Sequence, residues 1–260
     1  MANKLIIPFS IIIAGGLIAL AIFLTLSDKP DEGLTIEELG YSAEEMESLI
    51  DSIGVHNRVL GSEDPDVKIV EYSDLECPAC KPFHPILAAI VEEYNGKVAW
   101  EFKHFPLPSL HRKATYEAHA LECIGQLGGD KAFFIGLDAI YSLTPSNDGL
   151  NLNFLPAIAV GAGVDKDEFN ACVEEERYMD IVDAHAKEAV AVGAQGTPHS
   201  VVYLKNPLSA QQREALEMYD TEVYADRELF PVSEDGKQIT LSGMYPYEIM
   251  KGALEIVMMP

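Results

Sequence analysis

Two cysteines, Cys77 and Cys80, lie where the character of the chain changes from strand to helix. The segment 67–72 (VKIVEY) is a short apolar run typical of a buried strand, and the segment 81–94 carries apolar residues at helical spacing. The segment 97–105 (KVAWEFKHF) alternates like a second strand. A strand, a helix and a strand of this length most economically form a parallel pair with a right-handed crossover. The CxxC sequence is therefore expected at the strand-to-helix turn of an α/β unit.

The chain between residues about 109 and 192 shows no convincing strand. Turn signals such as Gly128-Gly129 separate its apolar segments. The helical periods of these segments predict a helical insertion with helices at 114–127, 132–141, 154–160, 166–173 and 181–192.

Strand character returns after the insertion, at 199–204 (HSVVYL) and 237–241 (KQITL). We expect these two strands to form an antiparallel hairpin that completes the sheet. An acidic connection over about 206–236 lies between them, with a predicted helix at 209–218, and a last helix is predicted over 247–258.

The N-terminal segment is an apolar run from Leu5 to Leu26 without a charge. A helix of that length covers a hydrocarbon core of about 30 Å. A cleaved signal peptide is the alternative, but its apolar region is usually about 7 to 15 residues long and ends in a small-residue cleavage site. We therefore expect a single-pass anchor in the plasma membrane over residues 1–27, with Lys4 placing the N-terminus in the cytoplasm.

The rest of the chain would then face outward, where thiols are commonly oxidised. Residues 28–65 are expected to form an acidic tether with a short helix at 42–53, and residues 66–260 a single domain. The acidic stretch is most simply a solvated spacer, although a surface that docks a partner has the same composition.

The charge balance excludes one class of partner. The chain has 18 Lys and Arg against 42 Asp and Glu, for a net charge of −24. A nucleic-acid surface needs clustered cations to neutralise phosphates. We therefore expect no nucleic-acid partner.

The position of the CxxC sequence at the start of a predicted helix indicates that its first thiol is reactive. A cysteine at a helix N-terminus has its thiolate stabilised by unpaired backbone N–H groups and by the helix dipole. We expect Cys77 to be the exposed attacking sulfur and Cys80 the more buried resolving one. Half of a zinc site is an alternative, but it needs a second pair of ligands, and Cys123 and Cys172 stand alone about 50 residues apart. An inert structural disulfide is the third reading.

Three segments together resemble the DsbA-like branch of the thioredoxin superfamily. They are 71–85 (EYSDLECPACKPFHP), 104–107 (HFPL) followed by His111, and 193–198 (GAQGTP). The resemblance implies an α/β thioredoxin fold interrupted by a helical insertion. It also implies that Thr197-Pro198 is a cis-proline turn beside the CxxC, and that Thr197, Pro198, Pro78 and Ala79 bind the substrate.

The same resemblance assigns Glu71 as a buried acid that exchanges protons with Cys80 through water. A partly exposed strand carboxylate is the alternative. It further implies a structural disulfide between Cys123 and Cys172, against two reduced, buried thiols. His84, His104 and His111 are expected to have packing or hydrogen-bonding roles.

The sequence departs from the best-known DsbA pattern beside Cys77. Ala79 replaces a histidine often found between the cysteines, and Glu76 adds a negative charge. Both changes are expected to weaken stabilisation of the Cys77 thiolate and to give a less extreme oxidant.

The resemblance implies a membrane-anchored, extracytoplasmic bacterial oxidoreductase that passes its disulfide to exported, cysteine-containing proteins. A DsbB- or VKOR-type membrane partner would reoxidise it. We expect no cofactor besides the Cys77/Cys80 disulfide, and no metal. A reductase or isomerase of the same fold and a non-catalytic, surface-anchored binding protein are the alternatives.

Overall fold

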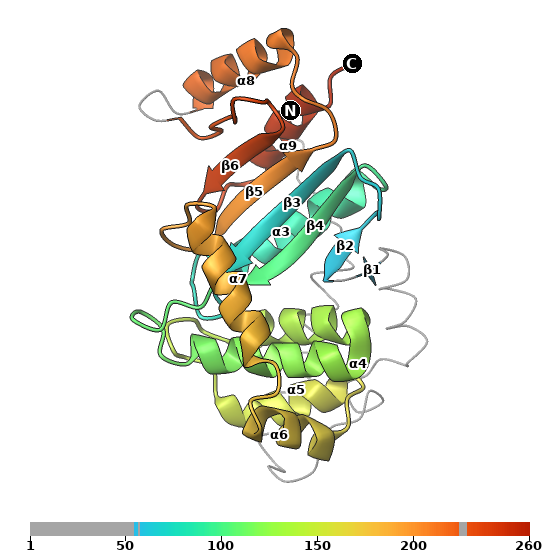
Figure 1. Ribbon diagram of the computed structural model, residues 1–260, viewed down its shortest axis with the longest axis vertical. Helices are drawn as coiled ribbons and strands as arrows, with labels where there is room; N and C mark the ends of the chain where they lie inside the picture. Colours follow the sequence, from blue (N-terminus) through green and yellow to red (C-terminus); the bar gives the residue numbers. More distant parts are fainter. Residues whose placement is uncertain (1–54, 57, 224–227) are drawn as a thin grey trace, which may run out of the picture.

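Strands β3 (Val67–Ser73) and β4 (Val98–His104) run parallel, joined by helix α3 (Cys80–Glu93). This confirms the predicted strand, helix and strand. The computed structural model describes residues 55–56, 58–223 and 228–260. In this part of the chain, six strands form a mixed sheet in the order β1-β2-β4-β3-β5-β6 (Figure 1).

The predicted hairpin closes one side of the sheet. Strand β5 (His199–Leu204) pairs antiparallel with β3, and β6 (Gln238–Ser242) pairs antiparallel with β5. Helix α8 (Ala210–Val223) lies in the connection between β5 and β6 and packs against the last helix, α9 (Tyr247–Val257).

Two strands on the opposite side were not predicted. Strand β1 (Val55–His56) pairs with β2 (Val59–Gly61), which pairs antiparallel with β4. Runs of two and three residues are too short to show the alternation that identifies a strand. Residues 55–56 and 59–61 therefore belong to the sheet, and the prediction of a tether up to residue 65 was wrong for them.

Most of the helical insertion between β4 and β5 lies beyond one end of the sheet, and its last helix returns to pack against the sheet (Figure 1). Its elements are α4 (Ala114–Leu143), the short 3₁₀ helix η2 (Leu152–Phe154), α5 (Leu155–Gly161), α6 (Lys166–Glu174) and α7 (Met179–Ala191). The two helices predicted at 114–127 and 132–141 form one long element with a kink at Gly129, whose φ of 82° lies in the left-handed region that glycine adopts without strain.

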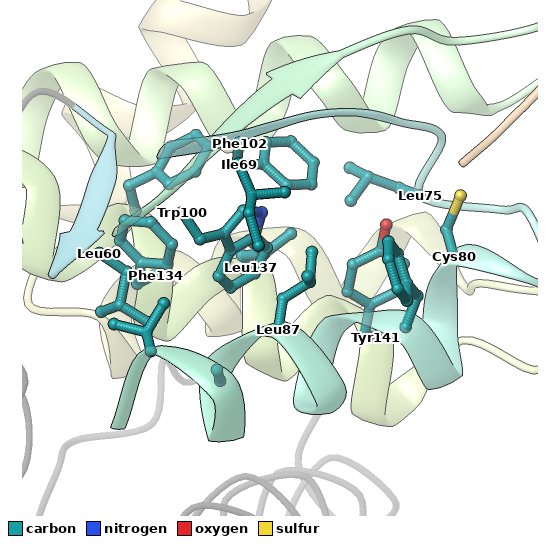
Figure 2. Close-up of a cluster of buried hydrophobic side chains, with 14 of the residues drawn as sticks. Leu60, Ile69, Leu75, Cys80, Leu87, Trp100, Phe102, Phe134, Leu137 and Tyr141 are labelled. Carbon is teal, nitrogen blue, oxygen red and sulfur yellow. The ribbon is translucent and has the colours of Figure 1, made fainter. Parts of the chain in front are cut away.

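Alternation along β3 divides the buried residues into two clusters. Ile69 faces the larger cluster, which includes Leu87 of α3, Trp100 of β4 and Leu137 of α4 (Figure 2). The intervening residues Val70 and Tyr72 face a smaller cluster that contains Ala189 of α7. Successive side chains of a strand point to opposite faces. Glu71 and Ser73 therefore lie on the same face as Ile69, towards α3 and α4.

The predicted anchor over residues 1–27 and the predicted helix at 42–53 lie outside the described residues. Within the part of the chain that is described, no helix has both the length and the apolar character needed to cross a membrane.

Candidate active site

Cys77 and Cys80 lie in the turn from β3 into α3. The carbonyl oxygen of Cys77 accepts hydrogen bonds from the backbone N–H groups of Cys80 (3.2 Å) and Lys81 (3.3 Å), which closes the first helical turn. Both cysteines are free thiols. Cys77 is 7% exposed and Cys80 is 0% exposed, while Pro78 between them is exposed. Cys77 is therefore the more accessible of the two, as expected, but it is itself buried, so the expectation of an exposed Cys77 was wrong.

The two thiols have opposite electrostatic environments. The hydrogen bond with the Cys80 side chain has the largest effect on the pKa of Cys77 and lowers it. Hydrogen bonds with Thr197 and with the backbone of Cys80 and Ala79 lower the pKa further. Together they outweigh burial, which raises it, and bring the Cys77 pKa to about 5. Burial, followed by the hydrogen bond and charge of Cys77, raises the pKa of Cys80 well above its ordinary value. At neutral pH the arrangement therefore holds Cys77 as a thiolate and Cys80 as a thiol.

The loop before β5 approaches Cys77. The peptide bond between Thr197 and Pro198 is cis, and Cys77 Sγ lies 3.4 Å from the carbonyl oxygen of Thr197. The carbonyl oxygen of Pro198 accepts a hydrogen bond from Gly243 N–H (2.9 Å), at the end of β6. The structure therefore brings 197–198 beside the CxxC turn, 120 residues away in sequence.

Glu71 is fully buried on the face of β3 that carries the larger core cluster. Its Oε2 accepts a hydrogen bond from Trp100 Nε1 (3.0 Å). Burial raises the pKa of Glu71 to about 8, opposed by hydrogen bonds from Ser73 and Trp100 and assisted by the charge of Cys77. The alternative of a partly exposed carboxylate is therefore wrong.

Asp74 fastens the active-site turn to the loop after β4, a role that the sequence analysis did not assign. Its buried carboxylate accepts from the backbone N–H groups of Glu76 (2.8 Å) and Leu107 (2.8 Å) and binds His111 Nδ1 (2.9 Å). Its carbonyl oxygen accepts from Cys77 N–H (3.0 Å). An Asp directly after a strand commonly bonds the backbone N–H two residues ahead, which is the signal that could have identified it.

His111 brings a basic group to the same place. Burial lowers the pKa of His111, but the hydrogen bond and charge of Asp74, with the charges of Cys77 and Asp148, raise it overall. His111 therefore takes a positive charge more readily and interacts favourably with the Cys77 thiolate. The hydrogen bond to Asp74 agrees with the expected packing or hydrogen-bonding role of His111, and the electrostatic contribution adds to it.

Glu76 does not act on Cys77 as the sequence analysis expected. Its buried carboxylate accepts hydrogen bonds from the backbone N–H groups of Gly149 (3.0 Å) and Leu150 (2.9 Å) and so fastens the loop after α4. It is not among the main influences on Cys77, whose pKa of about 5 shows a well stabilised thiolate. The expected effect of Glu76 on the Cys77 thiolate is therefore not seen, because adjacency in the sequence does not fix the direction of a side chain. The less extreme oxidant relative to the best-known DsbA pattern stays a prediction.

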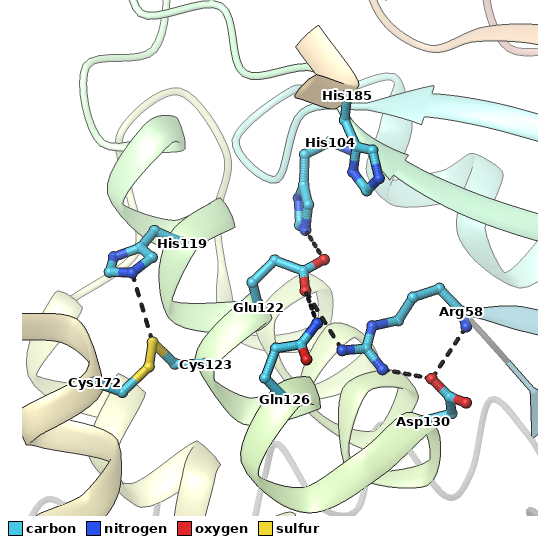
Figure 3. Close-up of polar contacts among 9 residues, drawn as sticks. All are labelled: Arg58, His104, His119, Glu122, Cys123, Gln126, Asp130, Cys172 and His185. Atoms are coloured by element: carbon cyan, nitrogen blue, oxygen red, sulfur yellow. Dashed lines mark hydrogen bonds and ion pairs between the residues drawn. A yellow bond between two sulfur atoms is a disulfide. The ribbon is translucent and has the colours of Figure 1, made fainter. Parts of the chain in front are cut away.

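Cys123 and Cys172 form a disulfide between α4 and α6, with an S–S distance of 2.06 Å (Figure 3). His119 Nε2 lies 3.6 Å from Cys123 Sγ. These three side chains make up a cluster of potential metal ligands in the described residues. With the two sulfurs bonded to each other, neither supplies the thiolate that a metal would need.

A network of ion pairs lies on the other side of α4 from this disulfide (Figure 3). Glu122, next to Cys123 on α4, binds His104 Nε2 (3.1 Å) and Arg58 Nη2 (3.4 Å), and Arg58 also pairs with Asp130 (Figure 3). Burial raises the pKa of Glu122, but the hydrogen bond and electrostatic interaction with His104, together with the charge of Arg58, outweigh burial and lower the pKa to about 2. The expected hydrogen-bonding roles of His104 and His84 agree with this pairing and with the contact between His84 and Asp138 (3.3 Å).

The amino-acid sequence is similar to those of several known proteins. Residues 54–219 match the profile of a protein family described as Thioredoxin. The chain is 27% identical over 226 residues to the "Probable disulfide bond formation protein D" of Bacillus cereus, covering 84% of this chain and 95% of that protein. It is also 26% identical over 144 residues to "Na(+)/H(+) antiporter NhaA 1" of Mycolicibacterium gilvum, covering 55% of this chain but 22% of the antiporter.

A similar fold occurs in the crystal structure of DsbA2 from Pseudomonas aeruginosa. The two structures have a TM-score of 0.57 and 23% sequence identity, and the match covers 78% of this chain and 94% of the other. The sheet with a helical insertion between β4 and β5 is therefore a known architecture.

Proposed function

The chain belongs to the thioredoxin family, as a DsbA-like thiol-disulfide oxidoreductase, and from this premise we propose that it oxidises exported proteins by passing them the Cys77/Cys80 disulfide. One observation carries the proposal. The structure pairs a stabilised thiolate at Cys77 with a buried, neutral thiol at Cys80, three residues apart at the start of α3.

The reaction follows from this asymmetry. A substrate thiolate attacks Cys77 Sγ of the disulfide, a mixed disulfide forms, and Cys80 leaves as a thiolate that takes up a proton. A second substrate thiolate then attacks the substrate sulfur of the mixed disulfide, and Cys77 leaves as a thiolate. Two substrate thiols become one disulfide, and the enzyme gains two electrons as a dithiol.

The low pKa of Cys77 supports the oxidising direction. A sulfur whose thiolate is stable is a good leaving group in the second step. Stabilising that thiolate also stabilises the reduced enzyme relative to its disulfide, which makes the disulfide the stronger oxidant. The Cys77 pKa of about 5 therefore favours an oxidase over a reductase.

Substrate binding is assigned to Thr197, Pro198, Pro78 and Ala79. Pro78 is exposed and Ala79 half-buried beside Cys77, while the Thr197 carbonyl lies 3.4 Å from Cys77 Sγ. An extended peptide can hydrogen-bond the backbone of Thr197 as its cysteine approaches Cys77.

The proposal also includes the setting of the enzyme. The apolar run from Leu5 to Leu26 supports a membrane anchor with the catalytic domain outside the cytoplasm. The turnover then needs a membrane oxidant of the DsbB or VKOR type, linked to quinones, to remake the Cys77/Cys80 disulfide.

Transfer of the disulfide tests the function. The oxidised full-length chain, purified in mild detergent, is mixed with reduced ribonuclease A, and disulfides are counted by alkylation and mass spectrometry. We expect the wild type to transfer its disulfide, and both Cys77→Ala and Cys80→Ala to transfer none, because neither variant can form the Cys77/Cys80 disulfide. Cys80→Ala whose Cys77 has first been joined to glutathione by oxidised glutathione should exchange the glutathione for a ribonuclease thiol and accumulate a mixed disulfide through Cys77. Cys123→Ala/Cys172→Ala is the matched control and should retain transfer.

The alternatives predict different results. Transfer by Cys77→Ala at the wild-type rate would exclude the assigned nucleophile, and a wild-type chain that forms no mixed disulfide would indicate a binding protein. Equilibration with glutathione measures the direction. We expect a reduction potential more positive than the about −270 mV of thioredoxin, whereas a value at or below it would favour the reductase.

A further inference from the structure

The proton that Cys80 exchanges must cross the buried side of the active site. Cys80, Glu71 and Ser73 are all 0–1% exposed. Glu71 and Ser73 are two residues apart on β3, so their side chains lie on the same face of the sheet, towards α3. The inference below rests on the proposed function, because it concerns the step in which Cys80 leaves or attacks.

The Ser73 hydroxyl has a fixed neighbour on one side. Ser73 Oγ and Tyr141 Oη are 2.8 Å apart, and Tyr141 is fully buried, with its hydroxyl 3.5 Å from the carbonyl oxygen of Asp74. Figure 2 shows the hydroxyl of Tyr141 and the sulfur of Cys80 at the same end of the buried cluster. A phenol that donates to Ser73 Oγ leaves the serine proton free to point elsewhere.

Ser73 also interacts with two reacting groups, Glu71 and Cys80. Hydrogen bonding with Ser73 lowers the pKa of Glu71, against the larger effect of burial, and it lowers the pKa of Cys80 in the same way. In the described part of the chain, Oε1 of Glu71 has no hydrogen-bond partner of normal geometry, while Trp100 holds Oε2. A buried oxygen without a partner is costly, and such atoms are frequent where a group has a chemical role.

We propose that the Ser73 hydroxyl, oriented by Tyr141, relays the proton between Cys80 and Glu71. When Cys80 attacks, its S–H proton passes to Ser73 Oγ while the Ser73 proton passes to Oε1 of Glu71, so the serine ends unchanged. When Cys80 leaves as a thiolate, the same two transfers run in reverse. A serine hydroxyl can donate and accept at once, which is what a relay requires.

The charge of Cys77 adjusts the relay to the reaction. The Cys77 thiolate contributes to the raised pKa of Glu71. In the mixed disulfide Cys77 carries no charge, so this contribution disappears and Glu71 ionises more readily. More of Glu71 is then in the carboxylate form that can accept a proton, in the state in which Cys80 must lose its own.

Other groups face the same space and enter the pH profile. His104 of β4 lies opposite Ser73 in register and is held by Glu122, and the Asp74 carboxylate is held by His111. Ser200 of β5 lies opposite Glu71, is fully buried, and has a hydroxyl with no hydrogen-bond partner among the described residues. Ser200 therefore supplies a matched control hydroxyl on the same face of the sheet.

The test measures the reactions of Cys77 and Cys80 as two successive phases. The reduced full-length chain reacts with 5,5′-dithiobis(2-nitrobenzoate), which releases one thionitrobenzoate when Cys77 is modified and a second when Cys80 attacks the resulting mixed disulfide. We expect Ser73→Ala to leave the first phase within twofold and to slow the second roughly tenfold or more at pH 7. Ser200→Ala should leave both phases within twofold.

A double-mutant cycle distinguishes a relay from a packing defect. Glu71→Gln should slow the second phase of the wild type but add less than twofold in the Ser73→Ala background, and both variants should lose the same inflection from the pH profile. An unchanged second phase in Ser73→Ala, or independent effects of the two substitutions, overturns the relay.

Two further results keep the test decisive. If Ser73→Ala does not fold, Tyr141→Phe decides, because the relay requires a slower second phase when the phenol is lost. A wild-type chain without a second phase would instead overturn the proposed function, since Cys80 would then not resolve the mixed disulfide.

Discussion

The two cysteine pairs of this chain occupy contrasting environments. Cys77 and Cys80 are free, three residues apart, at a helix N-terminus where one sulfur retains some exposure. Cys123 and Cys172 are 49 residues apart, fully buried between two helices, and joined. A disulfide inside a packed helical insertion stabilises the fold, whereas a cysteine pair beside a loop and near the surface can take part in thiol-disulfide exchange. The surroundings, and not the cysteines themselves, separate the two roles.

The buried carboxyl groups near the two cysteine pairs also differ, in their pKa values. Glu71, behind Cys80, is surrounded by neutral hydrogen-bond donors, and burial raises its pKa to about 8. Glu122, beside Cys123, is also buried, but His104 and Arg58 overcome burial and lower its pKa to about 2. Near neutral pH, Glu71 therefore keeps a proton that it can exchange, whereas Glu122 stays negatively charged.

The same substitution in the two carboxyls gives the largest expected difference. Glu122→Gln removes a buried carboxylate that is hydrogen-bonded to His104 and paired with Arg58, and should lower the free energy of unfolding at pH 7 by about 3–5 kcal/mol. Glu71→Gln replaces a mostly protonated acid with a neutral group of the same shape and should cost about 1 kcal/mol or less. Chemical denaturation of the two variants measures this, and equal losses would remove the contrast.

Removing each cysteine pair tests the division of roles directly. Cys123→Ala/Cys172→Ala should lower the free energy of unfolding by about 2–4 kcal/mol, because the unfolded chain regains the entropy of a long loop. Cys77→Ala/Cys80→Ala should change it by about 1 kcal/mol or less and abolish disulfide transfer. Thermal and urea unfolding of the oxidised proteins provide the measurement. The contrast fails if the 77/80 variant is the less stable of the two.

The smallest expected effect comes from Glu117, on the same helix as Glu122. Burial, with the hydrogen bond and charge of Glu76, raises the Glu117 pKa to about 9 from an ordinary 4.5. The folded state then binds more protons than the unfolded state between these values, so the free energy of unfolding falls as the pH rises through this window. Glu117→Gln cannot ionise and should gain roughly 1–2 kcal/mol over the wild type between pH 5 and pH 8.

Unfolding at the two pH values measures that gain. Glu92→Gln, at an exposed position of α3, is the matched control and should show no pH-dependent gain. A Glu117→Gln variant that follows the wild type across the window would mean that Glu117 is ionised in the folded protein.

Much of the fold could be predicted because its elements are long enough to carry a period. The segments 67–72, 97–105 and 199–204 alternate or run apolar, and each is a strand within a residue of its predicted ends. Strand β2, at Val59–Gly61, has no period and gains its stability from pairing with β4. Gly129 marks a kink, and not a break, because the helices on both sides pack into one insertion.

The sequence predicted the site only for residues that are close together in the chain. Cys77 and Cys80 are close in sequence, so their spacing was enough to predict a redox pair. The contacts of Asp74 with Leu107 and His111 cross more than 30 residues, and no local signal specifies them. The direction of Glu76, towards residues 149–150 and away from Cys77, is likewise set by the loop that it binds.

The sequence by itself determined the order of strands and helices and the position of the CxxC turn, since both follow from the periodicity and stereochemistry of neighbouring residues. The tertiary structure alone decided which buried acids keep their protons, because that depends on how many cations and hydrogen-bond donors the fold brings within a few ångströms. Glu71 and Glu122 are the same residue in the same chain, and their pKa values of about 8 and about 2 differ because one is packed against Trp100 and Ser73 and the other against His104 and Arg58.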